Sequence, residues 1–339
     1  MQGSLALTAM RNEGPFILEW VAWQKMLGFE NILILHNDCT DHSPQLLRLL
    51  DRVGEVSAKR HTPREGHTPR EGHSPQAEAY RTARRNRLVK QAEWMFTSDV
   101  DEFLVIHKGN GSIGALLNNG DVPFAAMAIN WRLFGGAGHR KWQDALVHRR
   151  FTYSSEPGFR RNSVIKSFVH HPRLYERLNA HCASSWRGKG IWGEGGNYWA
   201  LSDGSRFDEF HPNKHPQNAV PDDRKLHRIA EVHHYAVRSH EEFSFKKGRP
   251  AASDFADRYT DTFRKTLDRN EVENLAVSTY RKRFDTEYDR LCQIPGVMRL
   301  HHLCCADYVA GMCTKRGDDP AADERYLYHK EMAQKLPRN

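Results

Sequence analysis

Two aspartates one residue apart, Asp99 and Asp101, follow the apolar segment WMFTS at residues 94–98. That segment predicts a buried strand, and a strand ending there would present both carboxylates at one edge of a sheet. Carboxylate oxygens bind hard divalent cations, whose remaining positions suit phosphate oxygens and water. The pattern therefore indicates a metal site that could neutralise a diphosphate and stabilise it as a leaving group. Two acids in an exposed turn are the alternative, and the position after a strand favours the metal site.

A histidine far along the chain could supply a third ligand. His233 and His234 follow the apolar-rich segment 229–232, and a neutral imidazole is a common metal ligand. The chain has 20 histidines, so a surface or hydrogen-bonded role is the alternative for each of them. Spacing alone makes His234 a candidate ligand and does not decide between these two roles.

The beginning of the chain alternates strand and helix patterns, and these elements would position the acidic pair. Residues 4–10 and 32–35 are short apolar runs typical of buried strands, and each precedes a stretch with helical apolar spacing, at 15–27 and 44–53. This order predicts a parallel sheet with helices on its faces, whose ligands bind beyond the carboxyl ends of the strands. A polar cluster follows each of the two strands.

The rest of the chain continues this α/β pattern and ends in helices. Residues 75–91 predict a helix with a strongly basic face, which is either a solvated surface or a binding surface. We predict a catalytic domain over 1–250 and a helical C-terminal extension over 251–339. Further strands are expected at 125–131 and 164–169, irregular loops at 188–196 and 211–220, and helices at 255–291 and 303–312.

A hexamer, HTPREG, occurs twice in direct succession between residues 61 and 72. A six-residue period is too short for one supersecondary repeat, so a solenoid is excluded. The proline and glycine in each copy predict a duplicated loop, with a basic mobile flap as the functional alternative.

Charge and cysteine content limit the partners and the compartment. The net charge is +8 and the pI is about 9.2, which favours an anionic partner such as a nucleotide diphosphate, an acidic glycan, nucleic acid or a phospholipid surface. The basic residues are spread along the chain, as on a solvated surface.

The six cysteines form no CxxC pair, so we expect a reducing compartment. No apolar run reaches the length of about 18 residues typical of a membrane span. We expect a cytoplasmic protein with at most peripheral contact with an anionic membrane.

Five segments, spread over roughly residues 5–250, resemble in their order the motifs of the family-2-like and family-92-like (formerly DUF23) glycosyltransferases. They are MRNEGPFILEWVAWQKMLGFENILILHNDCTDHS, WMFTSDVDEFLVI, INWRLFGGAGH, VIKSFVHHP and HHYAVRSHEEFSFKKGR. The resemblance implies a GT-A fold, which is a Rossmann-like mixed sheet flanked by helices. It also implies a UDP-linked nucleotide-sugar donor, a glycan or other hydroxyl-bearing acceptor, and a divalent metal cofactor, Mn2+ or Mg2+.

The resemblance also implies roles at particular positions. His234 matches the histidine of the family's HYxxKS element and becomes a metal or diphosphate ligand. In a GT-A arrangement His234 would face Asp99 and Asp101, and His233 would point elsewhere. Lys166 and Arg238 become phosphate-facing cations, and an arginine can fork onto two phosphate oxygens. Arg238 replaces the family's lysine, and residues 249–250 are Arg-Pro where the family has Arg-Gly. The duplicated hexamer is not part of the family pattern.

The polar clusters after the first two strands would form the nucleoside side of the site. Arg11, Asn12 and Glu13 are expected to contact the nucleoside. Asn37 and Asp41 are expected to close the pocket for the base and ribose. A purely structural role in a turn is the alternative for Asn37 and Asp41.

Trp131 and the loop GGAGH, which ends at His139, are expected on the acceptor side. Glycines allow close backbone approach, and an aromatic ring can stack on a sugar face. The loop lacks the Lys-Ser/Thr ending of a phosphate-binding P-loop. An inverting transfer, which we expect, also needs a carboxylate that accepts the proton of the acceptor hydroxyl. Of Glu194, Asp203 and Asp208 we favour Glu194, in a glycine-flanked loop, and a retaining mechanism stays open.

Two other classes of function fit part of the pattern. A metal-dependent phosphotransferase or nuclease could use the same aspartates, although the sequence offers no second acidic cluster for a two-metal site. A basic nucleic-acid-binding module could use the arginine-rich helix at 75–91, and it would bind with a steep salt dependence. We expect no nucleic-acid partner.

Overall fold

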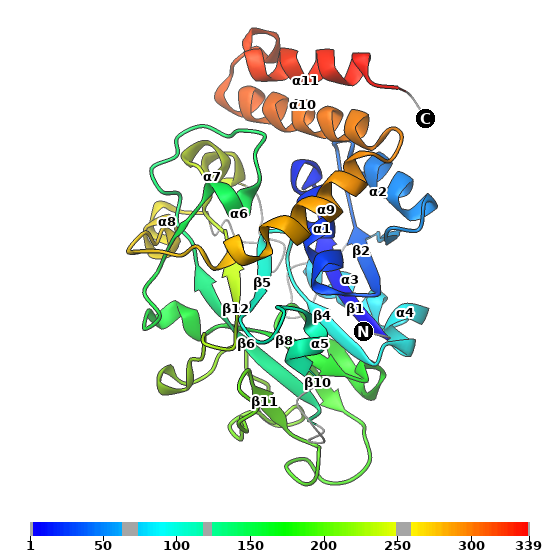
Figure 1. Ribbon diagram of the computed structural model, residues 1–339, viewed down its shortest axis with the longest axis vertical. Coiled ribbons are helices and arrows are strands. Elements are labelled where there is room, and N and C mark those ends of the chain that lie inside the picture. Colours follow the sequence, from blue (N-terminus) through cyan, green and yellow to red (C-terminus); the bar gives the residue numbers. More distant parts are fainter. Residues whose placement is uncertain (1–2, 63–73, 118–123, 249–258, 338–339) are drawn as a thin grey trace.

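The computed structural model describes residues 3–62, 74–117, 124–248 and 259–337 (Figure 1). All but the first two residues of the duplicated hexamer lie outside these ranges. The central sheet of the described residues is mixed and has nine strands, in the order β3-β2-β1-β4-β8-β6-β12-β5, with β11 beside β6. Its strands are β1 (Ser4–Met10), β2 (Asn31–His36), β3 (Ser57–Arg60), β4 (Trp94–Thr97), β5 (Glu102–Ile106), β6 (Ala126–Leu133), β8 (Ile165–His170), β11 (Trp199–Leu201) and β12 (Ala230–His234).

The strand directions bring several strand ends to one edge of this sheet. Strand β1 pairs in parallel with β2 and β4, and β6 pairs in parallel with β11 and β12. Strand β8 runs antiparallel to β4 and β6, and β5 runs antiparallel to β12. The carboxyl ends of β1, β4, β6 and β12 therefore lie beside the beginnings of β5 and β8. We call this edge the carboxyl edge.

Helices cover both faces of the sheet, so its inner strands are buried on both sides (Figure 1). Strand β1 shows the alternation: Leu5 and Leu7 pack into one core cluster, and Ala6 and Met10 into the other. The longer helices are α1 (Ile17–Leu27), α2 (Ser43–Arg52), α3 (Pro75–Ala83), α9 (Arg281–Cys292), α10 (Val297–Arg316) and α11 (Glu324–Lys335). The shorter ones are α4 (Arg87–Gln91), α5 (Ile113–Leu117), α6 (Val147–Arg150), α7 (His240–Lys246) and α8 (Asp261–Leu267), with the 3-10 turn η1 (Gly14–Phe16) before α1.

The predicted fold class, a mixed α/β sheet flanked by helices with a helical C-terminal segment, is confirmed. Strand β1 has the predicted bounds, and the loops at 188–196 and 211–220 contain neither helix nor strand. The single helix predicted over 75–91 is wrong, because α3 ends at Ala83 and α4 begins at Arg87. The side chain of Asn86 accepts a hydrogen bond from the backbone N–H of Leu88 at 2.9 Å and so caps a new helix.

The C-terminal segment is more varied than predicted and packs on the beginning of the chain. The predicted stretch 255–291 contains a strand, β13 (Val272–Glu273), which pairs with β7 (Tyr153–Ser154), and α11 was not predicted. Helix α10 contacts η1 and α2. Its Asp307 accepts a hydrogen bond from the backbone N–H of His42 at 2.8 Å. The domain boundary at residue 250 lies outside the described residues and stays a prediction.

Within the described ranges, no helix is both long and apolar enough to cross a membrane.

The contact between Gly14 and Cys304 leaves no room for a side chain on Gly14. A Cβ added there would lie 2.5 Å from the Cβ of Cys304. We expect Gly14→Ala to lower the free energy of unfolding by about 1–3 kcal/mol, the usual cost of overpacking, as measured by urea denaturation. Gly158→Ala is the matched control, because nothing lies within 4 Å of its added Cβ. Equal stability of the two variants would contradict close packing of α10 on η1.

An ion-pair cluster links α9 to the first half of the chain and predicts an acid-dependent loss of stability. Arg290 binds both carboxylate oxygens of Glu55, at 2.6 and 2.8 Å, and Lys25 lies 2.7 Å from the same carboxylate. The hydrogen bond from Arg290 lowers the pKa of Glu55 to about 2, and Lys25 adds to this effect against burial.

Because the folded-state pKa of Glu55 is depressed, its stabilisation is complete above the unfolded value near 4.5 and is lost as the pH falls towards 2. We expect Glu55→Gln to cost about 1–2 kcal/mol at pH 7 after solvent screening and much less near pH 2. Denaturant titrations at several pH values would measure this difference. The exposed Glu156→Gln is the control, and parallel pH profiles of wild type and Glu55→Gln would exclude the proposed linkage.

Candidate active site

The two aspartates predicted to bind metal lie in the turn between β4 and β5, at the carboxyl edge. The side chain of Glu102 accepts a hydrogen bond from the backbone N–H of Asp99 at 2.8 Å, which fixes the first half of the turn. The carbonyl of Asp101 accepts one from the backbone N–H of Tyr235 at 2.9 Å, so the turn is also tied to the end of β12. Neighbouring strand ends therefore hold both carboxylates in place.

Lys166, at the beginning of β8, is fully buried and bridges a carboxylate of this turn and the first carboxylate of β5. Its Nζ lies 3.1 Å from Oδ2 of Asp99 and 2.8 Å from Oε2 of Glu102. Burial alone would lower the pKa of Lys166, but Asp99 and Glu102 outweigh it and hold that pKa above its ordinary value. Burial raises the pKa of Glu102, and Asp99 and Asp101 add to this effect while Lys166 opposes it.

Asp101 faces a second set of cationic groups. Its Oδ2 lies 3.6 Å from Nζ of Lys246 on α7, and its Oδ1 lies 3.8 Å from Nε2 of His234 at the end of β12. Burial would raise the pKa of Asp101, but Lys246, His234 and Arg238 outweigh it, so the pKa lies well below its usual range. Asp101 is therefore an ionised carboxylate at neutral pH. His233, as expected, points to the other face of β12, where its Nε2 lies 2.8 Å from Glu231.

Arg238 is a buried cation whose donors are not used within the described residues. Its side chain is 1% exposed, and its Nε, Nη1 and Nη2 have no hydrogen-bond partner there. Nη1 lies 3.7 Å from Glu13 and 3.9 Å from Glu242, which are ion-pair rather than hydrogen-bond distances. The guanidinium stacks on the ring of Phe16, with Cζ 3.7 Å from the ring centroid. A buried guanidinium with free donors is a binding group for an anion.

The donor set fits a divalent cation in part. Ligands about 2.1 Å from one ion are separated by about 3 to 4 Å, and Asp101 and His234 meet this condition at 3.8 Å. Both oxygens of Asp99 are occupied instead, by Lys166 and by Nε2 of Gln76 at 2.9 Å. The ligand atoms of Asp99, Asp101 and His234 do not all lie within 4.8 Å of one another. Asp99 could join an ion only by turning away from Lys166.

The polar cluster after β1, Arg11 to Glu13, lies at the same edge, but its three residues differ in exposure and contacts. Arg11 is exposed. Asn12 has a left-handed backbone, with φ of 56°, and exchanges hydrogen bonds with Thr40 at 2.8 and 3.0 Å, which ties the loop after β1 to the loop after β2. Glu13 faces Arg238, and burial raises its pKa against the opposing effects of Lys246 and Arg238.

Asn37 and Asp41, after β2, have the contacts of turn residues. Asn37 donates from Nδ2 to Asp38 at 3.1 Å. Asp41 accepts from the backbone N–H and the hydroxyl of Ser43, at 3.1 and 2.7 Å, at the beginning of α2. These contacts match the structural alternative considered for both residues, and the nucleoside role stays a prediction.

On the acceptor side, Trp131 lies beside the metal candidates and His139 does not. The ring centroid of Trp131 is 4.2 Å from that of His234. His139 packs on Phe151, and its Nε2 lies 3.2 Å from the carbonyl of Arg150.

The glycines that precede His139 do allow close backbone approach, but the groups that approach belong to this chain. A Cβ on Gly136 would lie 2.4 Å from the carbonyl oxygen of Arg238, and one on Gly135 would lie 2.3 Å from Asn270. Asp268 and Asn270 accept hydrogen bonds from the backbone of this loop at 2.8 Å. The loop therefore supports the backbone of Arg238.

Glu194, the favoured catalytic base, is not brought to this site. It lies on an exposed turn that precedes β11, and β11 runs parallel to β6 beside the first residues of that strand. The turn is therefore at the opposite edge of the sheet from Asp99 and Asp101. The sequence showed a carboxylate flanked by glycines, but it did not show at which edge of the sheet that carboxylate would lie.

The sequence interpretation missed three contributors to the site. Gln76 and Glu102 hold Asp99, and Lys246 faces Asp101. Glu102 follows Asp101 directly, and Lys246 belongs to the segment FKKGR. Both residues could therefore have been found from the sequence motifs. Gln76 opens a helix distant in sequence, and its position carried no such signal.

No family model matches this chain, and no curated protein matches it. Among solved structures, S. aureus TarS 1–349 is 10% identical, with a TM-score of 0.34 over 98% of this chain and 92% of that one. The same part of TarS in complex with UDP-GlcNAc has a TM-score of 0.31 at the same identity and coverage. An active-site mutant of LgtC, also 10% identical, has a TM-score of 0.32 over 81% of this chain and 99% of that one. Scores of this size carry no inference about function.

The buried pair of Lys166 with Asp99 and Glu102 predicts a strong effect of substitution. Lys166→Met should lower the free energy of unfolding by about 3–5 kcal/mol, because it leaves the buried Glu102 and the partly exposed Asp99 without their cation. Adding Glu102→Gln should recover part of this loss in a double-mutant cycle measured by chemical denaturation. Lys335→Met, which removes an exposed pair with Glu331, should cost under about 0.5 kcal/mol. A Lys166→Met loss no larger than that of this control would mean that Lys166 is not a buried ion-pair partner.

Proposed function

We propose that this chain is a metal-dependent glycosyltransferase of the GT-A type. It would move a sugar from a nucleotide-sugar donor, UDP-linked, to a hydroxyl group of a glycan or other acceptor, with inversion. The observation that carries the proposal is the buried guanidinium of Arg238, whose donors have no partner among the described residues, beside the ionised Asp101 at the carboxyl edge. A diphosphate bound through a divalent cation would satisfy both groups, because its negative charge suits Arg238 and the positive charge of the cation suits Asp101.

The proposal assigns separate tasks to the groups at this edge. Arg238 and Lys246 would hold the diphosphate oxygens, because a fork of donors and a point charge both suit phosphate. Asp101 and His234, 3.8 Å apart, would hold Mn2+ or Mg2+, with Asp99 as a further ligand if it leaves Lys166. Such an ion, when bound, neutralises the charge that develops on the leaving diphosphate.

Lys166 would position the aspartates rather than contact the donor. Its ammonium is already bound between Asp99 and Glu102, and it is fully buried. It departs in this respect from the phosphate-facing role that the family resemblance implies. Arg238 keeps that role, because its donors are unused within the described residues.

The sugar-binding side of the site is proposed on fewer contacts. Trp131, whose ring lies against His234, would stack on a sugar face. Glu13 is near enough to Arg238 to line the donor site, and Arg11, Asn37 and Asp41 stay candidates for the nucleoside. A cytoplasmic location and contact with an anionic membrane surface also stay predictions.

A panel of nucleotide-sugars tests the class of function directly. A ligand that binds only the folded state raises the melting temperature, so we expect Mn2+-dependent stabilisation by UDP-sugars and slow hydrolysis of the donor. Transfer to a glycan acceptor would complete the assignment. Cleavage of phosphodiesters or phosphoanhydrides without any transfer would favour the phosphotransferase or nuclease alternative. Salt-sensitive binding of DNA or RNA, without a response to UDP-sugars, would favour the nucleic-acid-binding alternative.

Substitution of the proposed metal ligands should separate metal binding from folding. We expect Asp101→Asn to abolish Mn2+-dependent UDP binding and activity, because it removes the charge that holds the ion. His234→Ala should weaken that binding on the order of 10- to 100-fold. Isothermal titration of UDP with and without Mn2+ measures both effects, and circular dichroism checks the fold.

Asp318→Asn, at an exposed position just after the end of α10, is the control for this series. Unchanged Mn2+ dependence in Asp101→Asn would remove the metal assignment. UDP binding that needs no cation in any variant would leave Arg238 and Lys246 as the only diphosphate ligands.

A further inference from the structure

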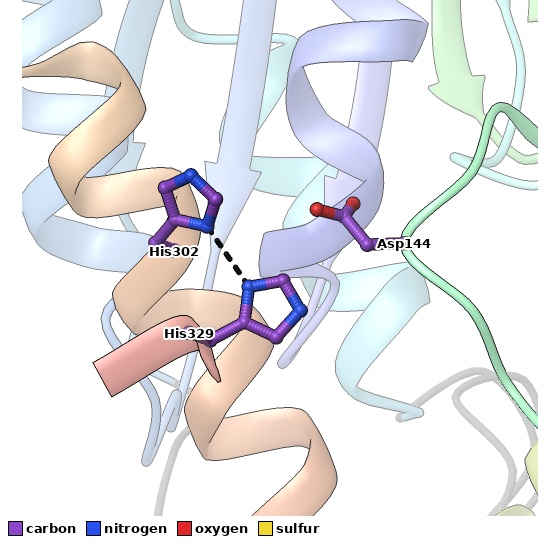
Figure 2. Close-up of side chains that lie close together, drawn as sticks. All are labelled: Asp144, His302 and His329. Carbon is purple, nitrogen blue, oxygen red and sulfur yellow. Dashed lines mark hydrogen bonds between the residues drawn. The ribbon is translucent and has the colours of Figure 1, made fainter. Parts of the chain in front are cut away.

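A second group of metal-ligand side chains, which shares no residue with the proposed donor site, lies where α10, α11 and the connection before α6 meet. Figure 2 shows Asp144 from the connection, His302 from α10 and His329 from α11 turned towards one another. One ligand atom from each lies within 4.8 Å of the other two. The Nδ1 atoms of the two histidines are 2.9 Å apart. No task in the proposed sugar transfer uses these residues.

Two further residues of α10 surround the carboxylate of Asp144. Nε2 of His301 lies 3.1 Å from Oδ1 of Asp144, and Sγ of Cys305 lies 3.5 Å from the same Nε2. Asp144, His301 and Cys305 form a second group within 4.8 Å. Nδ1 of His301 is buried and has no hydrogen-bond partner within the described residues.

The group is buried on the helix side and open on the loop side. His302 and His329 are 6% and 2% exposed, whereas the side chain of Asp144 is 31% exposed. Asp144 and His329 line a cavity of about 290 Å3, together with Trp142, Arg325 and Tyr328. Three candidate metal ligands therefore lie beside a solvent-accessible space in which a fourth ligand of a metal ion could bind.

Helix α11 has few apolar anchors, which gives His329 a special place in its packing. Of the 12 residues of α11, only His329 and Ala333 are buried, and Leu327 and Tyr328 are 50% and 53% exposed. A helix normally buries an apolar stripe, and burying an imidazole costs free energy unless its nitrogens are bonded. His329, the most buried residue of α11, is thus a residue that needs a polar partner.

We propose that Asp144, His302 and His329 bind one divalent transition-metal ion, of which Zn2+ fits best. Two imidazoles and a carboxylate are ligands typical of zinc, which takes three protein ligands and one further ligand at open sites. His301 acts as a positioning residue, because its ring holds Oδ1 of Asp144 and so orients that carboxylate. The ion ties α10 and α11 to the connection that leads from the GGAGH loop to α6.

Metal content is the direct test, on full-length protein purified without a histidine tag. We expect about one zinc ion per chain by mass spectrometry of metals after dialysis against Zn2+ and gel filtration. We expect chelation to lower the melting temperature by a few degrees and added Zn2+ to restore it. His329→Asn should lose the ion and the Zn2+ response, whereas the exposed His215→Asn is the matched control and should keep both.

Several outcomes would overturn the proposal. Zinc content below one tenth of the chain concentration, with no thermal response to Zn2+, would mean that His302 and His329 simply share a hydrogen bond. Equal zinc binding by wild type and His329→Asn would place the ion elsewhere. If His329→Asn does not fold, Asp144→Asn, on a partly exposed connection, takes its place with the same expected loss.

Two more variants separate this site from its neighbours. Loss of zinc in Cys305→Ser, together with retention in His329→Asn, would assign the ion to the second group and refute the ligand set. Asp101→Asn should keep its zinc, because the proposed donor site uses other residues. A zinc ion lost with Asp101→Asn would mean that the metal seen is the one at the carboxyl edge.

Discussion

The buried ammonium group of Lys166 is the interaction on which the carboxyl edge depends. Strand β8 lies between β4 and β6, and a cation buried there is tolerated only when carboxylates surround it. Asp99 supplies one from the turn between β4 and β5, and Glu102 supplies the other from the first position of β5. Fixing this turn leaves Asp101 on its other side, facing Lys246 and His234. The carboxylates that neutralise Lys166 thus also fix the direction in which Asp101, the proposed metal ligand, points.

The sequence was informative where the pattern is local. Apolar runs gave the bounds of β1 and placed Asp99 and Asp101 at a strand end, because a strand buried on both faces leaves a continuous apolar signature. It was less informative where distant segments decide the outcome. The glycines of the GGAGH loop indicated close approach, but only the fold identifies Arg238 and Asn270 as the approaching groups. Glu194 was misplaced for the same reason, since strand direction is a property of the whole sheet.

The segment after residue 258, which was predicted as a helical extension, packs on the earlier part of the described chain at several points. Arg290 on α9 binds Glu55, and Arg325 on α11 binds Glu241 on α7 at 2.7 and 3.0 Å. Asp268 supports the loop beneath Arg238. Substitutions in these helices can therefore act on the carboxyl edge without touching a donor or an acceptor.

The contact of Gly14 with Cys304 has a consequence for the order in which the protein matures. The loop after β1 is synthesised well before α10, the helix that packs on it. Strand β1 can pair with β2 and β4 early, but the loop that carries Glu13 reaches its final position only when α10 docks. A ribosome-bound chain that ends before α10 would therefore have a sheet without a finished carboxyl edge. The proposed donor site would therefore be completed only after α10 has been synthesised and has docked.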